Sequence, residues 1–560
     1  MSGNDDIAEA WAFHDATKYS VREESDGPGI AMGTPPDLEE AIWEKDRSLE
    51  PFPYKIYTSL QPIPLPREFA TSTVPAFDAL SAVGGEASVA GAPPPPDLAT
   101  LARIALYSCG LLDRRTTLRG GRVIDYRAAG GTGARFHLEA YLVCGGLPDL
   151  PAGVYHYAAH DHSLRQLRSG DFRGALSHAS GSEPALASAP VVLALTSTFW
   201  RNAWRYKARA YRHTYWDAGT TLSHTRAVAA STGLPATLVM GYVDKEVNDL
   251  LGVDGVRETT VALCALGHGG AASPPTGRPE VPPLDLPTQP ISPGEVTFPA
   301  IPRMHAATCL DSVAEVERWG ASPLVRTPAE PRGPLVPLAP FAPADLAAVS
   351  VEEVIARRRS TRHFDVDAEL PFAAFSTLLD RSTRGIAADC LTPGARALHD
   401  CYLIVHGVEG LAPGVYVHHP ALGGPGHLGE HGHGGAAGAV ELLREGDFRQ
   451  DAQRLAVGQW YPADAHVNAY YLTDLTPVLR SYGNRGYRLS QLECALSAGI
   501  LHLGTHALGR IDHAGAVVRL GAVGSTSCDD DVVEFFSPHA AGKSYMFVTV
   551  FGRRRPTRRR

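Results

Sequence analysis

The sequence predicts two similar lobes in one chain, each built of helices and buried strands and related by a pseudo-twofold axis. Two observations support this prediction. The chain has 560 residues, which exceeds the size of one ordinary hydrophobic core. Short strings of the first half also return in the second half, in the same order and at a nearly constant separation.

Four pairs of strings carry this repeat, and their separation takes only two values, 261 and 276 residues. Thr132–Arg135 returns as Pro393–Arg396, Gly153–Tyr155 as Gly414–Tyr416, Leu167–Arg173 as Leu443–Arg449, and Arg209–Arg212 as Arg485–Arg488. Because the order is kept, chance is a poor explanation. A tandem duplication, with the two lobes forming an internal dimer, explains all four pairs.

The separation grows at a glycine-rich stretch of the second half that contains five histidines. They are His418, His419, His427, His431 and His433. Their composition resembles a metal-binding tract, but their spacing matches no defined metal motif. We therefore predict an inserted loop here and no metal site.

The elements of the first half run from an irregular arm to a closing strand. Residues 1–96 are rich in proline, glycine and acid and end in the run Pro93–Pro96, which predicts an arm and a stiff spacer. Residues 97–270 form the first predicted domain. Its expected elements are a helix from Asp97, strands over 139–144, 151–157, 191–196 and 258–266, and a long helix from Arg209 to Thr232 that ends at Gly233.

The second half begins after a stretch that is again rich in proline and glycine. Residues 271–345 are therefore predicted to be a linker or a wrapping arm and not a core. Residues 346–560 form the second predicted domain, which repeats the first.

Composition excludes several classes of function. A formal charge of −9 argues against a nucleic-acid-binding protein, and no apolar run is long enough to span a membrane. The start of the sequence lacks the pattern of a signal peptide. The eight cysteines are scattered and form no Cys-x-x-Cys pair, so we expect reduced thiols in a cytoplasmic protein without a zinc site or disulfides.

The most distinctive local feature is a short helix that ends in basic residues. Ser350 and Glu353 form a capping-box signature, and Arg357, Arg358, Arg359, Ser360 and Arg362 follow. Guanidinium groups bind phosphate oxygens in pairs, and a serine hydroxyl adds a directed hydrogen bond, so the string suits a dianion. The alternative is a solvated basic helix end that complements the helix dipole.

This string resembles the Arg-x-Ser-x-basic motif with which the nitroreductase superfamily binds the phosphate of FMN. Other strings are similar to the SagB-type branch, the azoline-oxidising dehydrogenases of thiazole and oxazole peptide pathways. These strings are Thr17–Tyr19, Gly133–Arg135, Gly153–Tyr157, Arg209–Arg212 and Asn248–Asp254. The resemblance implies an α+β fold with a mostly antiparallel sheet. It also implies dimerisation through long helices, with FMN at the interface.

The two halves differ in the residues that this resemblance assigns to FMN. The first half has no Arg-x-Ser-x-basic string before Asp97, and its closing strand is followed by Gly267-His268-Gly269. The second half has both the string and a basic exit from its closing strand. A buried dianion without cations is costly, so we expect one flavin per chain. The implied ligands are Arg358, Arg359, Ser360, Arg362 and Arg553, with Gly131, Thr132 and Gly133 of the first half supplying the partner loop.

The resemblance also indicates the catalytic residues. SagB-type enzymes carry a Lys-Tyr pair just before the Arg-x-Tyr-Arg string, where this chain has Arg205 and Tyr206. Arginine cannot act as a base, but it can favour the phenolate form of Tyr206, and Lys207 is the alternative base. Packing at the start of a helix is the other explanation of Arg205 and Tyr206. For Asp217 and Glu493, which match across the halves, we expect ion pairing on a helix surface.

Three functions remain open at this stage. The first is an FMN-dependent dehydrogenase that converts thiazolines or oxazolines of a ribosomally made precursor peptide to azoles, beside a cyclodehydratase partner. The second is a general NAD(P)H-dependent nitro- or quinone-type reductase. The third is a catalytically weakened, peptide-binding member of a biosynthetic complex. A further homodimer, beyond the internal one, is left open.

Overall fold

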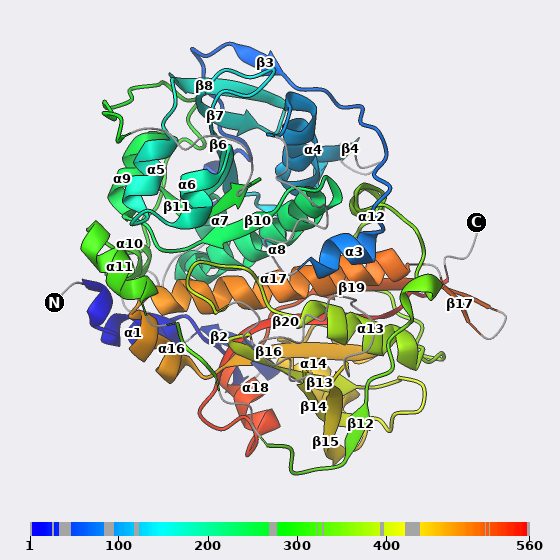
Figure 1. Ribbon diagram of the computed structural model, residues 1–560. Helices are drawn as coiled ribbons and strands as arrows, with labels where there is room; N and C mark the ends of the chain where they lie inside the picture. The colour runs from blue at the N-terminus through cyan, green and yellow to red at the C-terminus, as the bar shows by residue number, and fades with distance from the viewer. Residues whose placement is uncertain are drawn as a thin grey trace.

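Two lobes face each other across a pair of long helices, α8 (Ala210–Ser231) and α17 (Arg485–Leu508), which run through the middle of the molecule (Figure 1). The computed structural model describes residues 3–24, 27–32, 46–82, 95–116, 123–267, 277–321, 323–326, 330–392, 397–420, 437–509, 511–513 and 516–556. The predicted loop with His427, His431 and His433, the string Pro393–Arg396 and His268 lie outside the described residues.

Each lobe contains one antiparallel sheet of seven strands, and the strand order is the same in both. In lobe 1 the order is β10 (Ala236–Val239), β11 (Glu258–Leu266), β9 (Val191–Thr198), β6 (Leu138–Cys144), β7 (Gly153–Ala158), β8 (Ser163–Ser169) and β3 (Pro62–Pro64). In lobe 2 it is β19 (Leu520–Gly524), β20 (Ser544–Arg553), β16 (Val467–Thr473), β13 (His399–Val405), β14 (Gly414–His419), β15 (Ala439–Glu445) and β12 (Leu335–Pro337). The predicted pair of α+β lobes is confirmed.

Irregularities of the two sheets repeat as well. The pairing of β7 with β8 shifts register between Val154 and Tyr155, and that of β14 with β15 shifts between Val415 and Tyr416. A bulge bends a strand and is set by local sequence, so its recurrence follows from the repeated Gly-Val-Tyr string.

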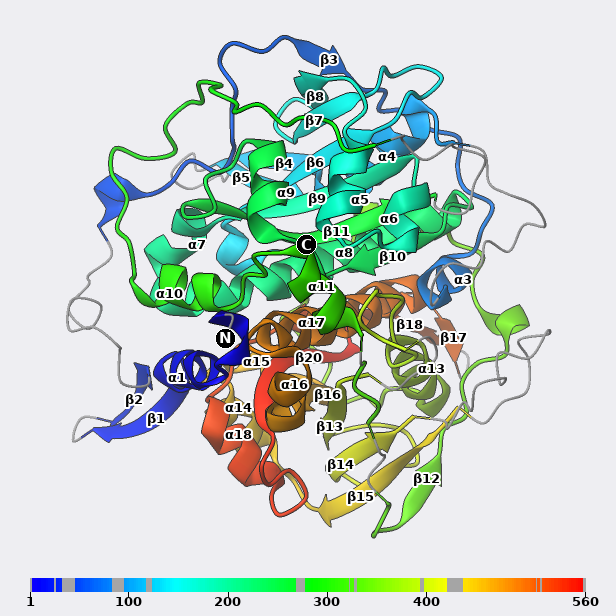
Figure 2. The ribbon, with the colours of Figure 1, turned by 60° about the vertical axis from the view of Figure 1, so that its left-hand side comes forward.

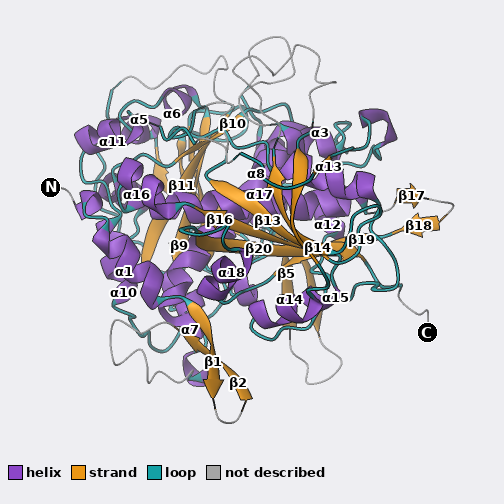
Figure 3. Ribbon diagram, turned by 90° about the horizontal axis from the view of Figure 1, so that it is seen from below, coloured by secondary structure: helices purple, strands orange, loops and turns teal. Residues whose placement is uncertain are grey.

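Helices cover both sheets and their edges. Lobe 1 has α4 (Leu98–Cys109), α5 (Arg173–Ala179), α6 (Pro184–Ser188), α7 (Phe199–Tyr206) and α9 (Asp244–Leu251). Lobe 2 has α12 (Val351–Arg357), α13 (Phe372–Ser382), α14 (Arg449–Leu455), α15 (Tyr461–Asp464), α16 (Leu475–Tyr482) and α18 (Asp529–Phe536). Three small hairpins are β1 (Tyr19–Glu24) with β2 (Gly27–Met32), β4 (Leu111–Thr116) with β5 (Val123–Arg127), and β17 (Ile511–His513) with β18 (Ala516–Val518). The β1–β2 hairpin projects from the body of the molecule (Figure 3).

The long helices approach closely at two glycines. A β-carbon at Gly219 would overlap with the carbonyl oxygen of Leu492, and one at Gly499 would overlap with the hydroxyl of Ser223. Glycine lets the two backbones come together, so the lobes share a continuous buried interface along α8 and α17. The site described below lies against this interface.

The segment predicted as a linker contributes ordered structure. Residues 277–321 contain α10 (Ala300–Ala307) and α11 (Val313–Gly320), and Met304 and Trp319 on these helices are buried. The N-terminal arm contributes α1 (Ala8–Ala16) and α3 (Ala76–Ser81). Helices α1 and α10 lie side by side at one end of the long helices (Figure 2). Among the described helices, none is both long and apolar enough to cross a membrane.

Candidate functional site

Arg358 connects the two lobes. The hydroxyl of Ser350 accepts a hydrogen bond from the backbone N–H of Glu353 and begins α12, as the capping box predicts. Arg358 follows the last turn of α12, and its side chain is only 7% exposed. Its Nε donates to the carbonyl oxygen of Ala128 at 3.1 Å, and an Nη donates to that of Arg127 at 3.5 Å. Both acceptors belong to lobe 1.

The charge of Arg358 has no counter-ion within the described part of the chain. Burial and the neighbouring Arg359 lower the pKa of Arg358 to about 10. Burial, and after it the charge of Arg358, lowers the pKa values of three histidines on the long helices: His224, His502 and His506. Burying a cation without an acid partner costs on the order of several kcal/mol. An anion that binds beside Arg358 would offset this cost.

The other predicted anion ligands point in different directions. Arg359 donates to the carbonyl oxygen of Arg358 and lies 3.5 Å from a carboxylate oxygen of Asp113. Ser360 and Arg362 are exposed, and the Arg362 guanidinium lies 5.9 Å from the ring centre of Tyr461. Arg553 donates to the carbonyl oxygen of Glu369, away from Arg358.

Arg554 is a residue that the sequence analysis missed. Its charge, with that of Arg358, lowers the pKa of His506, whereas the charge of Arg553 acts on His466. Arg553 is the last residue of β20, and Arg554 follows it with an exposed side chain. Successive side chains at the end of a strand point to opposite faces, so the two charges act on different histidines.

The loop of lobe 1 that follows Ala128 reaches both Arg358 and Tyr206. A β-carbon at Gly130 would lie 3.7 Å from an Nη of Arg358. Gly133 has a φ of +59°, and a β-carbon there would overlap with the hydroxyl of Tyr206. Glycine is therefore required at Gly133 for both conformation and space. The predicted residues Tyr206 and Arg358 thus both lie against the loop that contains Gly131–Gly133.

Asp217 fixes the position of this loop. Its carboxylate accepts hydrogen bonds from the backbone N–H and the hydroxyl of Thr132, at 2.7–2.9 Å, and contacts His137 at 2.8 Å. In lobe 2 the carboxylate of Glu493 accepts from the backbone N–H of Leu398 and contacts His399. The prediction of ion pairing on a helix surface was wrong for both residues, because both are buried and orient loops.

Tyr206 stands at the end of α7, with its ring between the glycine loop and His213. The Arg205 guanidinium lies 5.4 Å from the centre of the Tyr206 ring and lowers the pKa of Tyr206, but burial raises that pKa more strongly. The expected stabilisation of the phenolate is therefore outweighed. Near neutral pH the Tyr206 hydroxyl is protonated and can donate a hydrogen bond.

Lys207 has a backbone conformation that is unusual for a lysine. Its φ is +50° and its ψ is −141°. Gly483, which is 276 residues further on, has a φ of +63° and a ψ of −160°. Lobe 2 thus uses glycine where lobe 1 retains a lysine, at a cost of about 1–3 kcal/mol. Strain that is retained at one of two equivalent positions indicates a functional residue.

A row of aromatic rings leads from Tyr206 across the interface. Ring centres are 4.6 Å apart for Tyr206 and His213, 4.9 Å for His213 and Trp216, and 5.3 Å for Trp216 and Phe547. The indole N–H of Trp216 donates to the side chain of Gln491. Since Phe547 and Gln491 belong to lobe 2, this row of tilted and edge-on rings has contributions from both lobes.

The repeated Arg-x-x-Arg strings join the lobes at two buried carboxylates. Arg209 and Arg212 of lobe 1 bind Asp529 of lobe 2, and the guanidinium of Arg209 is 2.9 Å from its carboxylate. Arg485 and Arg488 of lobe 2 bind Asp244 of lobe 1, with 2.7 Å for the contact of Arg488. We call these two clusters the interlobe clasps. Their role is structural.

The clasps reveal a further repeat that the sequence analysis missed. Arg212 donates to the hydroxyl of Thr17 in the N-terminal arm, and Arg488 donates to the hydroxyl of Thr308 after α10. His14 and His305 precede these threonines at the same distance in sequence. The shared pattern His-x-Ala-Thr was the available signal, but it lay inside the segment that was predicted to be a linker.

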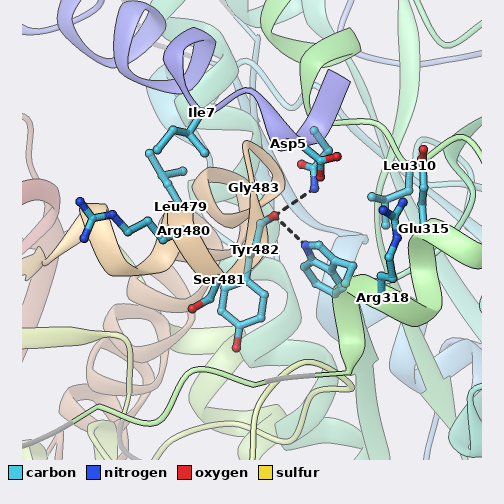
Figure 4. A pocket seen from close by; sticks show the side chains of 12 residues that line it. Asp5, Ile7, Leu310, Glu315, Arg318, Leu479, Arg480, Ser481, Tyr482 and Gly483 are labelled. Carbon is cyan, nitrogen blue, oxygen red and sulfur yellow. Dashed lines mark hydrogen bonds between the residues drawn. The ribbon is translucent and has the colours of Figure 1, made fainter. Parts of the chain in front are cut away.

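The position equivalent to Tyr206 in lobe 2 is arranged differently. Tyr482 borders an open cavity of about 390 Å³, and the labelled side chains of Arg480 and Arg318 stand to either side of it (Figure 4). Trp319 of α11 packs against Tyr482 with tilted rings whose centres are 5.4 Å apart, and its indole N–H donates to the carbonyl oxygen of Tyr482. A β-carbon at Gly241 would lie 3.2 Å from the Trp319 ring. The segment that joins the lobes thus fills part of the second position.

Comparisons with known proteins agree with this architecture. Residues 147–268 match the model of the nitroreductase family. A "putative nitroreductase" of Methanocaldococcus jannaschii is 24% identical over 174 residues, which cover 31% of this chain and 82% of that protein. The crystal structure of a "putative nitroreductase" from Anabaena variabilis has a TM-score of 0.68 and 23% identity, and the match covers 98% of this chain and 99% of that chain.

The fold is therefore nitroreductase-like over both lobes. A chain of the Escherichia coli microcin synthetase McbBCD complex with truncated pro-MccB17 bound also matches. Its TM-score is 0.28 at 17% identity, over 48% of this chain and 93% of that chain. A similarity at that level carries no argument about function.

The residues at Arg358 fit the phosphate of a flavin nucleotide. Among the described residues, no acid lies beside the buried Arg358 guanidinium. A phosphate dianion at this place would supply the missing counter-ion. The aromatic row beside Tyr206 adds apolar surface near this place.

Proposed function

We propose that this protein is an FMN-dependent oxidoreductase that holds one flavin per chain, between the two lobes. The observation that carries the proposal is the buried Arg358 guanidinium, which has no acid partner among the described residues and lies at the junction of two nitroreductase-like lobes. The first half of the chain has no equivalent basic string before Asp97. The position at Tyr482, which is equivalent to that of Tyr206, is also partly filled by Trp319.

Arg358 and Arg554 would hold the phosphate, and the loop of Gly131, Thr132 and Gly133 would border the ring. Ser360, Arg362, Arg359 and Arg553 stay proposed ligands. Ser360 and Arg362 are exposed, so their side chains can turn without repacking a core. The Asp217 carboxylate holds this loop in place through its hydrogen bond from the backbone N–H of Thr132.

We propose azolines of a ribosomally made peptide as the substrate. Conversion of a thiazoline or oxazoline to an azole removes a hydride and a proton from adjacent ring carbons. The bound flavin supplies the hydride acceptor, with molecular oxygen as the final oxidant. The chain must therefore supply a group that accepts the proton and groups that orient the ring.

Lys207 is the proposed proton acceptor, and Tyr206 is proposed to orient the azoline through its hydroxyl. Tyr206 stays protonated near neutral pH, because burial raises its pKa, so it is a donor rather than a base. Arg205 has no site that can accept a proton, whereas the Lys207 amine has one when it is neutral. The strained backbone at Lys207 favours this assignment.

The substrate chemistry implies a partner. Azolines form by loss of water from cysteine, serine or threonine residues of a peptide, so a cyclodehydratase must act first. We propose that it is the working partner of this protein, with the precursor peptide passing between the two.

A general NAD(P)H-dependent nitro- or quinone-type reductase is the second candidate function. The replacement of the Lys-Tyr pair by Arg205-Tyr206 and the protonated state of Tyr206 favour it, since reduction of such substrates needs no protein base in that place. A peptide-binding protein without turnover is the third. It requires that the purified protein bind no flavin.

One experiment separates the three. Purified protein is mixed with FMN, oxygen and an azoline-bearing peptide, and the peptide mass is followed. Loss of two hydrogens per ring supports the proposal, and Lys207→Ala should lower that rate at least about tenfold while flavin binding is retained. Bleaching by NADPH with a nitroarene, without any change of peptide mass, supports the reductase. Protein that stays colourless after FMN addition supports the third function.

A further inference from the structure

A cluster of buried histidines surrounds Arg358, and the proposed function does not yet use it. His224 lies on α8, and His502 and His506 lie one turn apart on α17, with ring centres 5.4 Å apart. His224 and His506 are buried at 1% and 3% exposure. Both long helices thus contribute a basic group to one place, and we call His224, His502 and His506 the histidine cluster.

The charged groups that face the cluster are all basic. They are Arg357 and Arg358 at the end of α12, Arg359 after it, and Arg554 after β20. The nearest carboxylates on α12 are engaged elsewhere, since Glu352 pairs with Arg103 and Glu353 with Arg357. Asp113 pairs with Arg115 and Arg359 at the rim. A cluster of this composition is stable only with neutral histidines or with an added anion.

Hydrogen bonds determine how each ring can respond. The Nδ1 of His224 is 2.9 Å from the carbonyl oxygen of Thr220, so Nδ1 carries the proton of the neutral ring. Its Nε2 is buried near the carbonyl oxygen of Ala128 and makes no well-formed hydrogen bond with the described residues. This nitrogen becomes a donor only when the ring gains a second proton. The Nε2 of His506 is 3.1 Å from the carbonyl oxygen of Arg359, which places its proton there.

We propose that the histidine cluster forms the inner wall of a phosphate site with Arg358, and that His224 takes up a proton when a phosphate dianion binds. The proposal deepens the proposed function, since FMN is the phosphate-bearing ligand, and it rests on that function. Its consequence is a flavin affinity that depends on pH through a histidine of the protein.

Burial and, less strongly, the charge of Arg358 together lower the pKa values of His224 and His506 to about 3 in the protein without an anion. A dianion beside His224 opposes both effects and raises its pKa. If the raised value lies above neutral pH, FMN binding takes up one proton, and its affinity falls by up to about tenfold per pH unit as the pH rises. The second ionisation of the phosphate has a pKa of about 6 and contributes little above pH 7.

The test compares FMN with riboflavin, which lacks the phosphate. Flavin is removed from the full-length protein, and both ligands are titrated by fluorescence at pH 7.0 and pH 8.5. The expected result is a Kd for FMN that rises about tenfold or more between these values, with a Kd for riboflavin that stays constant. His224→Asn should weaken FMN about tenfold at pH 7.0 and remove the pH dependence, without changing riboflavin binding.

Two further variants keep the test decisive. His502→Asn should also weaken FMN relative to riboflavin, which covers the case in which His224→Asn does not fold. His406→Asn is the matched control, because burial also lowers the pKa of His406 to about 3 but its neighbouring cation is Arg449 and not Arg358, and it should bind FMN as wild type does. An unchanged pH dependence in His224→Asn, or an equal one for riboflavin, overturns the inference. If the inference about His224 fails but Arg358→Ala loses FMN, the proposed function is still supported. If the wild-type protein binds no flavin, both the inference and the proposed function are wrong.

Discussion

At the scale of single residues, the two halves of the chain provide internal controls for each other. Lys207 and Gly483 share one backbone conformation, but only glycine adopts it without strain. Asp217 and Glu493 share the task of holding a loop. Where the halves agree the residue serves the fold, and where they differ the residue is a candidate for function.

Lys207→Gly should therefore stabilise the folded protein and lower its catalytic activity. Relief of the positive φ is expected to raise the free energy of unfolding by about 1 kcal/mol, because lysine is strained there and glycine is not. Oxidation of an azoline peptide should fall at least about tenfold. Urea unfolding and a peptide mass assay measure the two effects.

The matched control is Gly483→Ala in lobe 2, which should destabilise the protein, since a β-carbon there would overlap with the carbonyl oxygen of Asn4. A Lys207→Gly protein that is less stable than wild type would contradict the assignment of strain.

Buried histidines predict sensitivity to acid. Burial lowers the pKa values of His224, His305, His406 and His506 to about 3, against about 6.5 in an unfolded chain. Below pH 6.5 the unfolded chain binds protons that the folded one does not, so stability is lost as the pH falls from 6.5 toward 3. Each histidine contributes up to about 1.4 kcal/mol per pH unit in that range.

The urea midpoint of the flavin-free protein should therefore be constant between pH 8 and pH 7 and fall between pH 6.5 and pH 5. His406→Asn, which removes one such group in the sheet of lobe 2, should make the decrease shallower. A midpoint that does not change down to pH 5 would show that these rings are not kept neutral by burial.

At the scale of elements, the sequence predicted regular features well and missed features made by distant parts of the chain. Alternation and capping signals located the helix after Ser350 and the long helix that ends at Gly233. The ordered helices α10 and α11 were missed, because their many neighbouring prolines indicated a linker. The contact of Thr308 with Arg488, which matches that of Thr17 with Arg212, shows that this segment repeats the N-terminal arm.

The candidate site followed the same division. Arg358, the glycine loop and Tyr206 could be assigned from local strings, and the structure brings them together. Local strings do not report which of Arg553 and Arg554 faces the interface, because the direction of a strand's side chains depends on its register. They also do not report the histidine cluster, since His224 and His502 are 278 residues apart in sequence and meet only through the crossing of α8 and α17.

Replacing Trp319 on α11 tests why the position at Tyr482, equivalent to that of Tyr206, is not expected to bind a flavin. Trp319→Ala should lower the free energy of unfolding by about 3 kcal/mol, because it removes a large buried side chain and its contacts with Tyr482 and Gly241. Flavin content should stay at one per chain, since the second position has no basic string. A variant that binds two flavins would contradict the view that the missing cations, and not Trp319 alone, prevent binding.

At the scale of the whole molecule, the interlobe clasps make the two lobes one unit. Each clasp places two arginines on one buried carboxylate from the other lobe. Asp529→Asn and Asp244→Asn should each lower the free energy of unfolding by about 3–5 kcal/mol, because each leaves two buried guanidinium groups without a counter-ion.

Lys245→Ala breaks an exposed pair with Asp249 and is the control, with an expected effect below about 1 kcal/mol. Thermal unfolding of the three variants measures these differences. Clasp variants that unfold in two separate transitions would show that the clasps also couple the lobes. Clasp variants as stable as the control would show that the long helices alone hold the lobes together.

In the part of the chain that the structure describes, the buried cation without a counter-ion at the lobe junction is Arg358, although the two sheets are equivalent. The most direct measurement of this claim is the number of FMN molecules bound per chain, from flavin absorbance and protein concentration, in wild type and in Arg358→Ala. The account predicts one FMN in the wild-type protein and close to none in the variant. Two bound flavins in wild type, or an unchanged flavin content in Arg358→Ala, would contradict it.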